Sequence, residues 1–260
     1  MAKWTHFYLV RIEFLGFRYH GWQKQSELKS IQGMINKTLL FILEHDNFKT
    51  LGCGRTDARV SADDFAFEFF THTQFLPDKL LIQLNDNLPT DIRVKSVISV
   101  NSSFNIIQSA KTKEYHYNFS FGEKSHPFNA PHIYDFGAYL DIASMQDAVK
   151  LFIGKHNFKR YASKPSPNTI FEREILSAKI EKNTRFIASE TPENAYVFKV
   201  KSNGFLRYQV RLMMGALIAI GKGNWTINDL QESLANPEGK QIETIAPSSG
   251  LLLHKVEFHN

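Results

Sequence analysis

The sequence predicts an α+β fold made of two halves with the same order of elements, and two observations carry this prediction. Short stretches in which apolar and polar residues alternate are typical of strands, and stretches with apolar residues at helical spacing are typical of amphipathic helices. These stretches follow one another as β-α-β-β-α-β in residues 1–108, and the same order returns in residues 109–260. This is the order of the split-βαβ, ferredoxin-like unit. We therefore expect two ferredoxin-like domains.

The first half contains four predicted strands and two predicted helices. Alternating hydrophobicity places the strands at residues 6–14, 48–54, 65–71 and 91–100. The helix over 30–46 has Ser30 in the position of an N-cap, where a hydroxyl can accept a bond from a free backbone N–H. A second helix begins at Pro77 and stops before Pro89, because proline suits a first helical turn and restricts the residue before it.

The second half repeats this pattern with insertions. Its predicted strands cover residues 115–121, 175–182, 195–202 and 250–258. Its predicted helices cover residues 144–156 and 205–221, with an additional helix at 227–236. The last strand is expected to close the second half.

Composition limits the class of protein. The chain has 260 residues with 31 Lys plus Arg against 26 Asp plus Glu, a net charge of +5, which favours a polyanionic partner. The single cysteine, Cys53, excludes an internal disulfide and a cysteine-rich zinc site and fits a reducing compartment. The N-terminal residues alternate unlike a signal peptide. The longest nearly apolar run, residues 212–221, is shorter than the roughly 18 residues of a membrane span. We expect a cytoplasmic protein without membrane association.

The stretch LGCGRTDARVSADD is the strongest candidate for chemistry. It places Asp57 between Arg55 and Arg59, just after Gly52 and Gly54. The simplest interpretation is an aspartate that caps a turn. However, glycines allow backbone to approach a ligand closely, and arginines can bind phosphate or stack on a base. Predicted strands on both sides would hold this loop at the end of a sheet, which favours a functional site.

Two further candidates have simple structural interpretations. Arg211 lies in the predicted helix 205–221 and shares a face with Arg207, four residues earlier, as surface arginines often do. Tyr115 begins an alternating aromatic strand and shares a face with Tyr117, a pattern usual in a core. From the pattern alone, neither residue is distinguished from an ordinary structural one.

Six stretches in chain order together resemble the tRNA pseudouridine synthase A family over nearly the whole chain. They are GWQ (21–23), GRTDARVSA (54–62), NLP (87–89), KEYHY (113–117), FLRYQVRLMMG (205–215) and APSSGLLL (246–253). The stretch around the aspartate is specific, and the others are weak alone but collinear. The resemblance implies two ferredoxin-like halves facing a basic RNA-binding cleft, a homodimer, no metal and no organic cofactor. It also implies isomerisation of uridine to pseudouridine in tRNA, usually in the anticodon stem-loop.

The resemblance also implies roles for individual residues. Asp57 matches the essential aspartate, Arg211 the cation that keeps it ionised, and Tyr115 the tyrosine that stacks on the uracil. Arg55 is expected to fill or brace the stack from which the base is flipped, because a duplex base must leave its stack to be reached. The remaining substrate-binding candidates are Leu251 and Leu253, which would close the pocket, and Arg59, Trp22, Gln23, Lys111 and Lys113.

The chain departs from the family pattern near the expected RNA-facing positions. Arg59 replaces a usual glycine, Ser61 a usual histidine, Leu15 an acidic residue and Glu114 a basic one. Residues 105–107 read NII where the family has HAR. The chemistry is therefore expected to survive, while the target can be another uridine, rRNA or another RNA.

Two other classes of function compete with this interpretation. A non-catalytic RNA-binding protein or RNA chaperone would keep the basic surface, although the chain lacks the RNP1 run of the common RNA-recognition module. A metal-dependent nuclease would use the carboxylates of Asp57, Asp63, Asp64 and Glu68. Neighbouring residues of an extended strand point to opposite faces, so Asp63 and Asp64 do not suit one metal ion.

Overall fold

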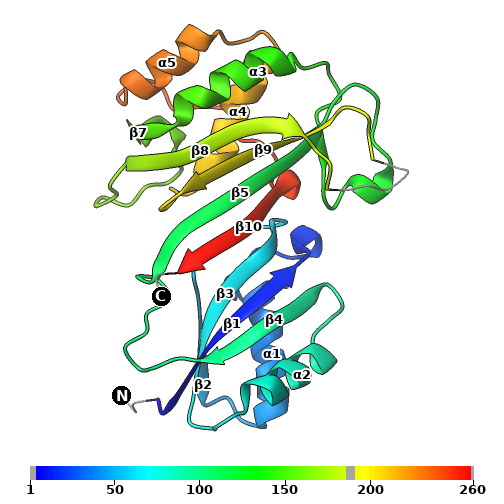
Figure 1. Ribbon diagram of the computed structural model, residues 1–260, viewed down its shortest axis with the longest axis vertical. Coiled ribbons are helices and arrows are strands. Elements are labelled where there is room, and N and C mark those ends of the chain that lie inside the picture. The colour runs from blue at the N-terminus through cyan, green and yellow to red at the C-terminus, as the bar shows by residue number, and fades with distance from the viewer. Residues whose placement is uncertain (1–3, 186–190, 259–260) are drawn as a thin grey trace. The chain divides into compact units, whose positions relative to one another are not determined.

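The computed structural model describes residues 4–185 and 191–258 and is an α+β structure, as predicted (Figure 1). Its chain forms two compact units. Unit 1 contains the described residues up to Lys111 together with those from Leu253 onward, and unit 2 contains Thr112–Leu252.

Unit 1 is a sheet with two helices against it (Figure 1). Its elements are β1 (His6–Phe14), a 3-10 turn η1 (Gly16–Arg18), α1 (Ile31–Leu43), β2 (Phe48–Gly52), β3 (Ser61–Thr71), α2 (Pro77–Asn87) and β4 (Ile92–Ser99). The strand order is β4-β1-β3-β10, and β2 also pairs with β3. β1 is antiparallel to both β3 and β4, and β2 is antiparallel to β3.

The core of unit 1 follows from the alternation along β3. Phe65, Phe67 and Phe69 are spaced by two, share one face of the strand, and are almost fully buried. α1 buries an apolar stripe of its own, made of Ile31, Ile35, Thr38 and Leu39. α1 starts where expected, because the Ser30 hydroxyl accepts a bond from the Gly33 N–H at 3.3 Å.

Unit 2 contains paired strands that are antiparallel except for β6 beside β5, with helices on one face (Figure 1). Its elements are β5 (Ala110–Ser120), β6 (Tyr134–Asp135), α3 (Ile142–Ala148), β7 (Gly154–Asn157), β8 (Glu172–Lys182), β9 (Ala195–Ser202), α4 (Gln209–Gly221) and α5 (Ile227–Ala235). The strand order is β5-β9-β8-β7, with β6 beside β5. In α4, every residue except Arg211 and Ala219 is buried.

Three differences from the prediction have local physical causes. The helix predicted over 144–156 cannot pass through Gly154, which has φ of +104°; α3 itself ends earlier, at Ala148, and is followed by a 3-10 turn and then β7. α4 begins at Gln209, four residues later than predicted, because Tyr208 takes the left-handed conformation with φ of +65°. The final strand, β10 (Leu251–Phe258), was expected to close the second half, but its residues from Leu253 onward belong to unit 1, where β10 neighbours β3.

None of the helices in the described part of the chain combines the length and the hydropathy that a bilayer-spanning helix requires.

Candidate active site at the Asp57 loop

Asp57 lies in the loop of residues 53–60, which joins β2 to β3. The two strands are paired up to Gly52 opposite Phe67, and the Cys53 N–H continues the ladder by donating to the Ala66 carbonyl at 2.9 Å. The loop is therefore fixed at the end of a hairpin, as the flanking strands predicted. Asp57 itself is half-buried.

A second loop, residues 15–22 after β1, packs against the Asp57 loop through hydrogen bonds. The Arg59 N–H donates to the Tyr19 carbonyl at 2.9 Å, and the Trp22 N–H donates to the Thr56 carbonyl at 3.3 Å. The Gly16 N–H donates to the Ser61 hydroxyl at 2.9 Å. Their partners Thr56, Arg59 and Ser61 lie on both sides of Asp57 in the sequence. The three bonds therefore hold the Asp57 loop against the 15–22 loop.

Glycines make this close approach possible. A Cβ on Gly16 would fall far inside the contact distance of the Val60 carbonyl oxygen and 2.9 Å from the Ser61 nitrogen. Gly21 has φ of +86°, and a Cβ there would lie 3.0 Å from the Asp57 carbonyl carbon. Both positions therefore require glycine, one for space and the other for space and backbone conformation.

The predicted ligand-approach role of Gly52 is replaced by a packing role. A Cβ on Gly52 would lie 2.5 Å from the Trp22 indole nitrogen, so the space above this glycine is filled by a side chain. Trp22 is 3% exposed, and its ring centroid is 4.3 Å from that of Phe65. The structure therefore places Trp22 in the core that supports the Asp57 loop, whereas its neighbour Gln23 is exposed.

The two arginines beside Asp57 are exposed, and neither forms an ion pair within the residues that the structure describes. The guanidinium carbon of Arg59 lies 4.3 Å from the centroid of the Phe17 ring. Arg59 also has φ of +68°, in the left-handed region that favours glycine. Within 4–185 and 191–258, Arg55 and Arg59 therefore form no ion pair with a carboxylate.

Asp91 anchors the 15–22 loop through its carboxylate and its backbone carbonyl. Its carboxylate accepts hydrogen bonds from the Tyr19 hydroxyl at 2.6 Å and from the Arg18 guanidinium at 2.5 Å, and its carbonyl accepts from the Leu15 N–H at 2.9 Å. Burial opposes ionisation of Asp91, but the bonds from Tyr19 and Arg18 outweigh it and hold the pKa of Asp91 below its ordinary value. Burial and the same carboxylate raise the pKa of Tyr19. An ionised Asp91 therefore fixes the loop that in turn holds the Asp57 loop.

In unit 2, Arg211 is the only charged residue of α4 and is half-buried. Its Nε donates to the Ala246 carbonyl at 2.7 Å, and the Ala246 N–H donates to the Arg211 carbonyl at 3.1 Å. The predicted shared face with Arg207 is wrong, because Arg207 precedes the helix. Its guanidinium lies instead over the Tyr208 ring, which Arg211 also approaches, at 4.9 Å.

The backbone that holds Arg211 is itself held by a buried tyrosine. The Tyr117 hydroxyl donates to the Pro247 carbonyl at 2.7 Å. Burial raises the pKa of Tyr117, and the positive charge of Arg211 acts in the opposite direction. Segment 246–247 therefore connects the arginine of α4 to the aromatic strand β5.

Tyr115 is the half-buried end of the aromatic row on β5. Tyr117 and Phe119 in the same row are fully buried, so the core interpretation holds for them. The Tyr115 ring meets the Phe205 ring edge to face, with centroids 5.3 Å apart. A tyrosine at the end of a buried row, fixed by a second ring, has the partial exposure that stacking on a base requires.

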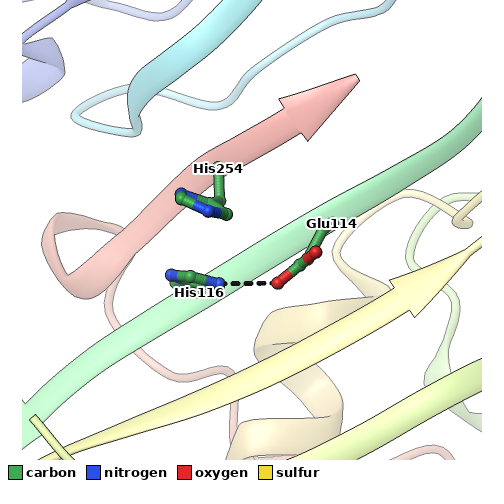
Figure 2. Close-up of side chains that lie close together, drawn as sticks. All are labelled: Glu114, His116 and His254. Carbon is green, nitrogen blue, oxygen red and sulfur yellow. Dashed lines mark hydrogen bonds and ion pairs between the residues drawn. The ribbon is translucent and has the colours of Figure 1, made fainter. Parts of the chain in front are cut away.

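The other predicted binding residues differ in exposure. Leu251 and Leu253 are 6% and 2% exposed, which agrees with the simpler core interpretation. Lys111 is exposed and Lys113 is half-buried. Glu114, which replaces a basic residue of the family pattern, bonds to His116 on the same strand at 2.8 Å (Figure 2).

The carboxylates of the nuclease hypothesis have separate partners. Asp64 pairs with Arg11 at 2.7 Å, and Asp63 bonds to His254 of β10, the third residue drawn in Figure 2, at 3.0 Å. Glu68 is 1% exposed and accepts a bond from the Ile106 N–H. Together with Asp57, these side chains form no shared group with metal-ligating distances among the described residues. This arrangement gives the metal-dependent nuclease no support.

Sequence reasoning missed the residues that support the site from a distance. Phe17, Tyr19 and Asp91 lie in or against the 15–22 loop, and Phe205 and Ala246 support the two residues of unit 2. A signal existed only for the 15–22 loop, in the glycines at its two ends.

Comparisons with known proteins agree on one family. The family model described as tRNA pseudouridine synthase matches residues 148–259. A tRNA pseudouridine synthase A of Thermodesulfovibrio yellowstonii is 32% identical over 96% of this chain and 98% of its own. The same-named protein of Aquifex aeolicus is 34% identical with the same two coverages. Among solved structures, a Cbf5-Nop10-Gar1 complex matches with a TM-score of 0.34 and 11% identity over 85% of this chain and 55% of that chain, which is too distant to inform the site.

Proposed function

We propose that this chain, which belongs to the tRNA pseudouridine synthase A family, isomerises uridine to pseudouridine in tRNA, with Asp57 as its catalytic carboxylate. The observation that carries the proposal for Asp57 is the construction of its loop. A half-buried aspartate stands between two exposed arginines that have no carboxylate partner in the described part of the chain, on a hairpin end bonded to a second loop. Such a site can hold an ionised carboxylate and attract a polyanion at the same place.

The reaction rearranges bonds within one nucleotide. The bond between C1′ of the ribose and N1 of uracil breaks, the ring turns, and a bond forms between C1′ and C5. C5 then loses its proton and N1 carries one, so atoms and electrons balance without an external oxidant or reductant. An ionised Asp57 can serve as the group that assists this rearrangement, because a carboxylate is able to attack carbon or to remove a proton.

We assign supporting roles to Arg211 and Tyr115. Arg211 would supply the positive charge that keeps the catalytic carboxylate ionised, since burial alone raises the pKa of a carboxyl group. Its bond to the Ala246 carbonyl fixes the direction of the guanidinium. Tyr115, braced by Phe205, would stack on the uracil ring.

Arg55 would fill or brace the stack that the flipped uridine leaves, since a planar guanidinium can stack on bases. Arg55→Ala is therefore expected to reduce turnover on folded tRNA more than it reduces tRNA affinity. Single-turnover rates and filter binding on the same tRNA measure the two effects. Equal losses in rate and affinity would contradict the flipping role.

The finer features of the proposal concern target, assembly and location. The anticodon stem-loop is the proposed target, and the enzyme is proposed to act as a cytoplasmic homodimer. A tRNA transcript and its isolated anticodon hairpin, with the modified position mapped in each, distinguish this target from others. Light scattering of the purified protein gives its mass in solution, and a monomer at working concentration would refute the dimer.

Tritium release tests the chemistry directly, because isomerisation through C5 must release a label carried there. Wild type and Asp57→Asn are compared on C5-labelled tRNA and rRNA, with Asp78→Asn, an exposed carboxylate in the first turn of α2, as the matched control. We expect Asp57→Asn to lose about 10⁴-fold or more in rate and the control to match wild type. Release from rRNA alone would overturn the tRNA target. Absence of release by wild type, with tight salt-sensitive binding, would support a non-catalytic RNA-binding protein or an RNA chaperone instead.

A further inference from the structure

Arg59 combines a disfavoured backbone conformation with an immobilised side chain. Its φ of +68° brings the Cβ close to the following carbonyl, an arrangement that most residues other than glycine avoid. The hydrogen bond from its N–H to the Tyr19 carbonyl keeps it there. Strained residues that persist are concentrated where a side chain has to be presented in one direction.

The direction in which Arg59 points is set by Phe17. The guanidinium carbon lies 4.3 Å from the Phe17 ring centroid, a distance at which a cation is attracted by an aromatic face. Phe17 belongs to η1 (Gly16–Arg18), and Tyr19, the residue that follows η1, accepts the bond from Arg59 and is anchored on Asp91. Backbone and side chain of Arg59 are thus held by the same short segment.

The charge of Arg59 has no partner of its own within the described residues. The side chain is exposed, and no carboxylate there lies within ion-pair distance of it. A guanidinium that rests on a ring still has its N–H edge available, and that edge matches two oxygens of a phosphate. Because Phe17 already restricts the side chain, less rotamer freedom is lost when an anion binds.

We propose that Arg59, braced by Phe17, binds a backbone phosphate of the RNA next to the target uridine. Two peptide units separate Arg59 from Asp57, so their Cα atoms are at most about 7.6 Å apart. That distance corresponds to one or two nucleotides along a strand, whose phosphates repeat about every 3.4 Å along the axis when stacked. The inference rests on the proposed function, since it takes the nucleotide at Asp57 as its reference.

Salt dependence of RNA binding tests the proposal independently of catalysis. Replacing one phosphate-binding cation is expected to weaken binding about three- to tenfold and to reduce the slope of log K against log salt by about 0.7–0.9. Arg59→Gln should show both changes. Arg59→Lys should keep the slope because it keeps the charge, and Phe17→Leu should keep the slope while weakening binding. Lys37→Gln, an exposed lysine of α1 with the same loss of charge, is the matched control and should change neither quantity.

Arg59→Gly separates a binding role from a folding role. Glycine adopts a φ of +68° readily, so this variant should be at least as stable to urea as wild type while showing the reduced slope of Arg59→Gln. A wild-type slope in Arg59→Gln would overturn the phosphate contact. So would a loss of turnover without any change in slope, which would indicate an effect on loop geometry alone. Failure of the proposed function would be seen in a different measurement, as absence of tritium release by the wild-type protein.

Discussion

Gly16→Ala tests the claim that contact between the two loops positions Asp57. The added Cβ would collide with the Val60 carbonyl and lie 2.9 Å from the Ser61 nitrogen, so the two segments must separate by about 1 Å. The displacement breaks the buried bond from the Gly16 N–H to the Ser61 hydroxyl. Repacking costs about 1–3 kcal/mol and the unsatisfied donor about 1–3 kcal/mol, which together predict a loss of about 2–6 kcal/mol in the free energy of unfolding.

The catalytic consequence should be larger than the loss of folded protein. A misplacement of about 1 Å at a reacting group costs about 10²-fold in rate, so kcat for tritium release should fall by that factor at temperatures where the variant is folded. Gly204→Ala is the matched control, because no described residue other than its two chain neighbours has an atom within 4 Å of the added Cβ. Urea unfolding and single-turnover release are measured on both variants. Wild-type stability and wild-type kcat in Gly16→Ala would refute the argument.

Three further predictions concern charge. Asp91→Asn should destabilise the protein at pH 7, and by progressively less toward pH 3. The pKa of Asp91 is lower in the folded protein than its ordinary value of 3.8, so the ionised carboxylate stabilises the fold at pH values above 3.8, and this stabilisation is lost as the pH falls through the folded pKa. Urea unfolding at both pH values measures the difference. Burial raises the pKa of Glu68, so the wild-type protein loses stability as the pH rises from 4.5. Glu68→Gln cannot ionise, so its stability relative to wild type should be higher at pH 8 than at pH 4 in the same assay. An equal difference at both pH values would contradict this. Arg211→Lys loses the Nε donor to Ala246, so kcat should fall about 10²-fold while tRNA affinity stays within about threefold.

Elements with a strong period could be predicted from the sequence. β1 has the predicted bounds, α1 begins after the predicted N-cap, and α2 begins at the predicted proline. The failures occur where the backbone conformation of one residue overrides the pattern. Apolar spacing continues smoothly into Gly154 and back to Phe205, but a positive φ at Gly154 is incompatible with the predicted helix there, and a positive φ at Tyr208 delays the start of α4. Periodicity does not report on φ.

Residues of the candidate site could be predicted only where the signal is local. Asp57, its two arginines and its flanking strands are contiguous in sequence, and the structure holds them together as a hairpin end. The contact with the 15–22 loop joins segments about 40 residues apart, and no periodic pattern encodes it. Trp22 illustrates the consequence, since it fills the space above Gly52, whereas the sequence offered it only as a substrate-binding candidate.

Arg211 shows how tertiary contacts settle an ambiguous helix residue. From the sequence alone, a single arginine in an apolar helix is expected on the solvent-exposed face of that helix. In the structure almost the whole helix is buried, and the arginine is retained because a carbonyl 35 residues later accepts its Nε–H. That carbonyl belongs to a segment fixed by Tyr117, which an alternating strand pattern identifies only as core.

Three departures from the family pattern lie at one junction of two loops, which gives them a common explanation. Leu15 immediately precedes Gly16, whose N–H is bound by Ser61, and Arg59 is bound through its N–H to Tyr19. All three therefore lie along the same junction of two loops, where a change on one side alters what the other can accommodate. The Ser61 hydroxyl, smaller than the usual histidine ring, serves as a buried hydrogen-bond acceptor. Arg59 places a positively charged side chain where the usual glycine has none. The junction beside Asp57 is thus where this chain differs in charge from the family pattern while the aspartate itself is unchanged, which supports the proposal of a different RNA target over a change in chemistry.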